Sequence, residues 1–133
     1  MPPGAQPLQK MPTSSDAWPH EEARRLQERI RDYPPERPVI LESGFGPSGL
    51  PHLGTMCEVL RPAYVRQAFA LIEPARASRL IVFIDDMDGL RKVPENVPRR
   101  EELGQYLGAP VSRIPDPFGC CASFADHMIG LLG

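Results

Sequence analysis

A glycine- and proline-rich loop between two apolar segments constrains this chain more than any other feature. The loop, "GFGPSGLPHLGT", runs from Gly44 to Thr55; it follows a short apolar run at 38–43 and precedes an apolar helical pattern over 52–71. The clearest strand, "RLIVFI" at 79–84, comes next. Strand, glycine loop, helix and strand are the order of a right-handed βαβ unit. The sequence therefore predicts an α/β fold with a parallel sheet.

Further helices are predicted on both sides of this unit. Apolar residues at helical spacing from Trp18 to Tyr33 alternate with charges and predict an amphipathic helix. A short helix is expected over 99–107. A last helix begins at Ser123, where Asp126 completes a pattern similar to a capping box.

Pro62 lies inside the helix predicted over 52–71. A proline in a helix interior lacks the N–H donor and clashes with the preceding turn, at a cost of about 3 kcal/mol. We therefore expect a kink or a break at this position.

Length and composition suit one domain or part of one. The chain has 133 residues, of which 17 are prolines, and the proline-rich stretch 1–17 predicts a disordered leader before a folded region at 18–133. Neither a signal peptide nor a run of about 18 apolar residues is present, so we expect a cytoplasmic protein with no membrane partner. Three cysteines without paired spacing fit a reducing compartment.

The charge argues against nucleic-acid binding by bulk electrostatics. The formal net charge is −2, whereas phosphate contacts need clustered Lys and Arg. Among the basic residues only Lys10 and Lys92 are lysines. Any RNA partner must therefore be held elsewhere.

The glycine loop has the composition of a phosphate site. Gly44, Gly46 and Gly49 let the backbone approach a ligand, and a helix starting near His52 points its free N–H groups and positive dipole end at that ligand. His52 could donate a hydrogen bond to phosphoryl oxygens, and Gly54 would leave room for a flat base. The alternatives are an ordinary connection and a structural histidine.

A carboxylate-rich turn, Asp85, Asp86 and Asp88, directly follows the second strand. Ligands of parallel sheets lie beyond the carboxyl ends of the strands, so this turn and the glycine loop are predicted to share one site. Carboxylates there could attract a substrate ammonium group or Mg²⁺, and a solvated acidic turn is the alternative.

The cysteines give no metal signature by spacing. Cys120 and Cys121 are adjacent and His127 is near, but separated cysteine pairs are lacking. We predict buried or loop thiols and no metal site, and we expect Cys57 to be packed within its helix. No Cys, His and Asp arrangement suggests nucleophilic catalysis.

Two stretches resemble a known family. "ESGFGPSGLPHLGT" resembles the HIGH signature of class I aminoacyl-tRNA synthetases, with "HLGT" at 52–55 in the signature position. "DDMDGLRKVPENVP", "LGAPVSRIPDPFG" and "SFADHM" are similar to the class I lysyl-tRNA synthetase, the archaeal-type enzyme also found in some bacteria. The resemblance extends from Trp18 to Met128.

This resemblance implies the first half of a Rossmann-type (HUP-like) parallel sheet. It also implies an enzyme that joins lysine to ATP and then passes lysine to tRNA-Lys, with Mg²⁺ bound to the ATP. His52 would be catalytic. The implied ATP-binding residues are Pro47, Ser48, Gly49, His52, Gly54 and Thr55. The implied lysine pocket consists of Gly44, Gly46, Asp85, Asp86 and Asp88.

Several departures predict a truncated copy that is not competent alone. The lysine-bearing KMSKS loop, the insert between the fold halves and the anticodon-binding helices are not found, and tRNA-Lys would need parts absent from this chain. A non-catalytic remnant that binds ATP weakly or docks on a partner is therefore an alternative. "IVFIDDMDGL" also resembles haloacid dehalogenase-type phosphatases, with Asp86 as nucleophile and Asp88 as acid. An uncovered sheet edge predicts possible self-association.

Overall fold

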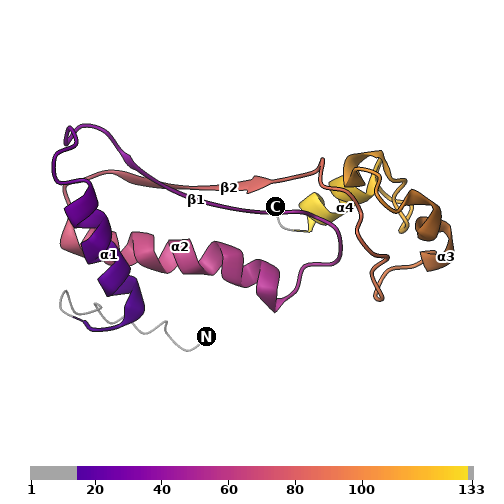
Figure 1. The fold of residues 1–133 in the computed structure, drawn as a ribbon, viewed down its shortest axis with the longest axis horizontal. Coiled ribbons are helices and arrows are strands. Elements are labelled where there is room, and N and C mark those ends of the chain that lie inside the picture. Colours follow the sequence, from indigo (N-terminus) through magenta and orange to yellow (C-terminus); the bar gives the residue numbers. More distant parts are fainter. Residues whose placement is uncertain (1–14, 132–133) are drawn as a thin grey trace, which may run out of the picture.

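The computed structural model describes residues 15–131, so residues 1–14 of the predicted leader lie outside the described part. Two strands, four α-helices and two short 3-10 helices follow one another in the described chain (Figure 1). Their bounds are α1 Trp18–Arg29, β1 Val39–Phe45, α2 Leu53–Ile72, β2 Ser78–Ile84, α3 Arg100–Leu103, η1 Gly104–Tyr106, η2 Val111–Arg113 and α4 Phe124–Gly130.

β1 and β2 form a parallel two-stranded sheet, and α2 is the crossover between them. The register pairs Val39 with Ser78 at one end and Phe45 with Ile84 at the other. The predicted α/β fold with a parallel sheet is therefore confirmed. Both long helices, α1 and α2, lie on the same side of the sheet in Figure 1.

The core of this layer lies between the helices and the sheet. It consists of Ala23, Ile30, Val39, Ala68 and Phe69. Strand residues alternate between the two faces, and Ile40, Ile81 and Phe83 on the opposite face are 49%, 48% and 52% exposed. Within residues 15–131, no element covers that face.

A second core follows β2. Its buried members are Leu90, Val97, Leu103, Val111, Ile114, Phe124, Ala125 and Met128. The helix predicted over 99–107 is a single α-turn, α3, that continues as the 3-10 helix η1. The predicted cap of the last helix is confirmed, because the Ser123 hydroxyl accepts from the Asp126 N–H at 3.1 Å and donates to its carboxylate at 2.7 Å.

We expected a kink or a break at Pro62; the break is wrong, since α2 runs through this residue as one helix of 20 residues. Pro62 cannot donate to the carbonyl of Glu58 one turn earlier. Ser43 of β1 takes over that role, because its hydroxyl donates to the Glu58 carbonyl at 2.6 Å. A residue on the neighbouring strand therefore satisfies the acceptor that the proline leaves free.

Even this longest helix is not a membrane span. Among residues 15–131, no helix is both long enough and apolar enough to cross a bilayer.

The Ser43 bond predicts a coupling between two substitutions. Ser43→Ala should lower the free energy of unfolding by about 1 kcal/mol, since it removes one hydrogen bond. In a Pro62→Ala background the restored N–H at position 62 can donate to Glu58, so Ser43→Ala should cost less there. Urea unfolding of the four proteins in this double-mutant cycle measures the difference. An equal cost in both backgrounds would contradict the assignment.

Candidate functional site

The glycine loop and the acidic turn lie side by side, as the strand order predicts. The Asp85 N–H donates to the Phe45 carbonyl at 3.0 Å and extends the ladder beyond the strand ends. Next along the chain, Gly46 faces Asp88 so closely that a Cβ on Gly46 would lie 2.7 Å from the Asp88 carboxylate. A side chain at position 46 would therefore displace the Asp88 carboxylate from the glycine loop.

A hollow of about 680 Å³ opens along the glycine loop. Gly46, Ser48, Gly49, His52 and Thr55 line it from the loop, and Arg91 and Lys92 line it from the segment after the acidic turn. Of the other predicted ATP-binding residues, Pro47 is buried and Gly54 is exposed. The structure thus brings four of the six predicted ATP-binding residues onto one concave surface.

His52 is the N-cap of α2. Its Nδ1 accepts from the Thr55 N–H at 3.3 Å, and its backbone is extended. An accepting Nδ1 leaves the proton of a neutral imidazole on Nε2. Nε2 of the exposed His52 ring has no hydrogen-bond partner among residues 15–131, so its N–H can donate to a ligand.

The space that we predicted for a base at Gly54 is filled by the His52 ring. A Cβ on Gly54 would lie 2.7 Å from His52 Cε1, so glycine allows the imidazole to fold back over the first turn of α2. The glycine serves the histidine cap in this structure.

The three carboxylates of the acidic turn differ in their partners. Asp85 closes the turn by accepting from the Met87 N–H at 3.2 Å, and Asp88 forms an ion pair with Arg91 at 3.3 Å. Asp86 is exposed, and its carboxylate has no hydrogen-bond partner among the described residues. Asp86 is therefore the carboxylate of the turn that is free to bind a cationic group.

The last predicted pocket residue, Gly44, lies under an aromatic ring. It pairs with Phe83 across the sheet, and a Cβ on Gly44 would lie 2.5 Å from the Phe83 ring. Because Gly44 has no side chain, the Phe83 ring can lie over this position of β1.

Arg91 and Lys92 line the hollow and are residues that the sequence analysis did not place at the site. From the sequence, we expect no residue of this chain to take the place of the mobile cation that the KMSKS loop supplies in the family. The structure places these two cationic side chains in the lining of the same hollow as His52 and Thr55 at the N-terminus of α2. Their position directly after a turn at a strand end was the available signal.

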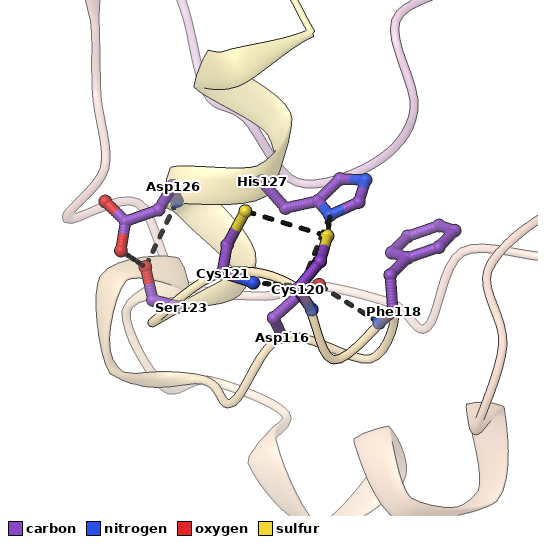
Figure 2. Close-up of polar contacts among 7 residues, drawn as sticks. All are labelled: Asp116, Phe118, Cys120, Cys121, Ser123, Asp126 and His127. Atoms are coloured by element: carbon purple, nitrogen blue, oxygen red, sulfur yellow. Dashed lines mark hydrogen bonds and ion pairs between the residues drawn. The ribbon is translucent and has the colours of Figure 1, made fainter.

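A second polar cluster surrounds Asp116, which is buried (Figure 2). Its carboxylate accepts from the backbone N–H groups of Phe118, Cys120 and Cys121 at 3.0, 2.9 and 2.9 Å. Burial raises the pKa of Asp116, but these three N–H donors and the Cys120 thiol outweigh it and lower the pKa to about 2. Asp116 is therefore an ionised, firmly held carboxylate.

Cys120 and His127 adjoin this carboxylate. Cys120 Sγ lies 3.1 Å from His127 Nδ1, which lies 3.2 Å from Asp116 Oδ2. A nucleophilic triad needs the thiol and the carboxylate on opposite ring nitrogens, whereas both address Nδ1 here. Desolvation, then Cys121 and Asp116, raise the pKa of Cys120 to about 11, which leaves a poor nucleophile.

The arrangement instead matches a metal-binding donor set. Asp116, Cys120, Cys121 and His127 each offer a ligand atom, and these atoms lie within 4.8 Å of one another. Adjacent cysteines and an aspartate four residues earlier gave no recognisable spacing, so the sequence did not reveal the cluster. Cys120 and Cys121 are exposed loop thiols. Cys57 is also exposed, and its predicted packing within α2 is wrong.

Comparison with known proteins gives matches over most of the chain. The family model described as "tRNA synthetases class I (K)" matches residues 16–133. A protein of Roseobacter denitrificans named lysine–tRNA ligase is 50% identical over 120 residues, which are 90% of this chain and 23% of that protein. A protein of Rickettsia prowazekii with the same name is 47% identical over 115 residues, 86% of this chain and 22% of its own length. The chain thus spans less than a quarter of these relatives.

The cap at His52 predicts a stability effect that is independent of any ligand. His52→Ala should lower the free energy of unfolding by about 0.5–1 kcal/mol, because the Thr55 N–H loses its acceptor. His52→Asn should retain stability, since asparagine caps helices well. Thermal unfolding followed by circular dichroism measures both, with Ser48→Ala as a control that lines the same hollow. A melting temperature unchanged in His52→Ala would show that the cap contributes nothing.

Proposed function

The chain belongs to the class I lysine–tRNA synthetase family, and from this premise we propose that it supplies the ATP- and lysine-binding part of a lysine–tRNA ligase. In the proposed reaction the lysine carboxylate attacks the α-phosphate of ATP, lysyl-adenylate forms and pyrophosphate leaves. The lysyl group then passes to tRNA-Lys. Transfer to tRNA is a proposal for the whole ligase, and we assign binding of the two small substrates to this chain.

The observation that carries the proposal is the hollow lined by the glycine loop and by two cations. A helix N-terminus and close backbone approach favour phosphate groups, and Arg91 and Lys92, which line the same hollow, add positive charge. The proposed ATP-binding residues are Pro47, Ser48, Gly49, His52, Gly54 and Thr55. Here Arg91 and Lys92 would neutralise part of the charge of the triphosphate.

His52 is proposed to act on the α-phosphate. Nδ1 is held by the Thr55 N–H, so Nε2–H can donate to a phosphoryl oxygen as negative charge develops there. The cap thereby sets the tautomer that the reaction needs. Its contribution is positioning and charge stabilisation.

The proposed lysine pocket consists of Gly44, Gly46, Asp85, Asp86 and Asp88. Asp85 accepts a hydrogen bond from the Met87 N–H within the turn, and Asp88 pairs with Arg91. We therefore assign binding of the substrate ammonium group to Asp86. Mg²⁺ would be held chiefly by the phosphates, with a carboxylate of the turn as a further oxygen ligand. Gly46 keeps the acidic turn close to the glycine loop.

The net charge of the chain agrees with assigning tRNA binding to other parts of the ligase. With a net charge of −2, contact with tRNA-Lys falls to other parts of a ligase. We place the activity in the cytoplasm.

Binding of ATP with Mg²⁺ tests the proposal by isothermal titration calorimetry. Lys92→Gln should weaken binding about fivefold, the equivalent of about 1 kcal/mol, because one cation facing the phosphates is lost. His52→Asn, which retains the helix cap, should also weaken binding. Arg100→Gln removes an exposed cation outside the hollow and should leave binding unchanged. Equal affinity in all four proteins would contradict the assignment of the hollow.

Activation of lysine is a separate readout. Lysine-dependent exchange of labelled pyrophosphate into ATP, abolished by Asp86→Asn with ATP binding retained, would support the ligase and the role of Asp86. Binding of ATP without any exchange would identify a non-catalytic nucleotide-binding protein instead.

A further inference from the structure

Three arginines lie at the end of the sheet opposite the glycine loop. Arg37 comes just before β1 and Arg76 just before β2, and the Val39 N–H donates to the Ala77 carbonyl at 2.9 Å, so the two strands start side by side. Arg29 is the last residue of α1, which leads into the turn before β1 (Figure 1). We propose that these three arginines bind the phosphate groups of a free nucleotide, at a second site that shares no residue with the hollow at the glycine loop.

The three arginines line one hollow of about 510 Å³, called here the arginine hollow. Pockets for small molecules have volumes of about 300–1,000 Å³, so this volume suits a nucleotide. Leu26, Ile30 and Val39 give the hollow apolar surface, and no acidic residue is among the described residues that line it. The arginine hollow therefore combines positive charge with apolar surface.

The carboxylates of the surrounding segments do not neutralise these arginines. Glu28 pairs with Arg31 at 2.8 Å, and Glu73 accepts a hydrogen bond from the Gln27 side chain. Glu36 is exposed and does not line the hollow. Among residues 15–131, the three arginines form no ion pair. Uncompensated charges of one sign around a concave surface attract counter-ions, so the arginine hollow favours an anion with more than one charge.

Arg76 is held in a fixed orientation. Its Nη2 donates to the Pro34 carbonyl at 3.0 Å, which ties the guanidinium to the turn before β1. Its Nε is buried and has no hydrogen-bond partner among residues 15–131, and a buried donor without an acceptor is costly. The guanidinium is therefore positioned by the described chain without being fully satisfied by it.

The side chains of the arginine hollow select the class of ligand. A guanidinium binds two oxygens of one phosphate group at a time, and three of them match the several charges of a phosphate chain better than the single charge of a carboxylate. Tyr33 also lines the hollow and is 57% exposed, so its ring offers a stacking surface to a base. Phosphates beside a flat ring are the chemistry of a nucleotide.

A free nucleotide suits the chain better than an RNA strand does. The phosphates of a strand need a track of clustered cations, whereas the chain has a net charge of −2 and the three arginines are grouped at one hollow. A bound nucleotide would join the end of α1 to the turns before β1 and β2. Because it binds only the folded arrangement, it would stabilise the pairing of the two strands.

Binding is tested by titrating uridine diphosphate, without Mg²⁺, into the full 133-residue chain in a calorimeter, with uridine as the matched ligand that lacks phosphates. Uridine diphosphate should bind and uridine should not. Arg37→Gln should weaken binding about tenfold, because a charge-assisted hydrogen bond is lost, and Arg37 is exposed, so the core stays intact. Tyr33→Ala should also weaken binding, whereas Tyr33→Phe, which retains the stacking ring, should bind as the wild type does.

Two further variants locate the site. Arg24→Gln removes an exposed arginine of α1 outside the hollow and should leave binding unchanged. The binding that depends on Arg37 should persist in Lys92→Gln, so the outcome is separate from that of the proposed ATP site.

Three outcomes would overturn the proposal. The first is no saturable binding of uridine diphosphate, or equal affinity in Arg37→Gln. The second is loss of binding in Lys92→Gln, which would place the ligand in the hollow at the glycine loop. The third is binding of a ten-nucleotide uridine RNA more than about tenfold tighter than uridine diphosphate, beyond its number of nucleotides, which would identify the ligand as a strand.

Discussion

The parallel pairing of β1 with β2 is the interaction on which the candidate ligand site depends. Because Phe45 pairs with Ile84, both strands end at the same level, and the Asp85 N–H carries the ladder one residue further. The glycine loop and the acidic turn therefore start next to each other. A shift of one residue would turn side chains to the other face and would separate Gly46 from Asp88. The hollow is a consequence of this register.

The features that the sequence predicted are those with local signals. The alternating elements, the cap at Ser123 and the loop at the strand end all follow from residue type and spacing. Pro62 was misjudged because the hydroxyl that satisfies Glu58 comes from Ser43, 15 residues earlier and on another element. The donor cluster was missed for the same reason, since Asp116 and His127 meet only when α4 folds back onto η2. Periodicity and motifs do not reveal contacts between elements that are distant in the sequence.

The positions of Arg91 and Lys92 bear on whether this chain has a cation in place of the one that its family carries on the KMSKS loop. From its shortage of lysine we expect no residue of this chain to take the place of the mobile cation that the KMSKS loop supplies in the family. Arg91 and Lys92, in the segment after the acidic turn, line the same hollow as the N-terminus of α2, and Arg91 pairs with Asp88. The acidic turn therefore carries negative charge and is followed directly by two positive side chains. This separation of charge across a few residues is what the proposed binding of an ammonium group beside a triphosphate requires.

The two cores of the chain have different consequences for the site. The first is one layer of helices against a sheet whose other face leaves Ile40, Ile81 and Phe83 about half exposed, so the strands that set the register are covered on one side only within the described residues. The second core, from Leu90 to Met128, is small, and apart from α4 it is built from turns. Short elements bury little apolar surface per ordered residue. Backbone bonds from η2 to the carbonyls of Asp86 and Asp88 therefore fix the turn together with this apolar packing.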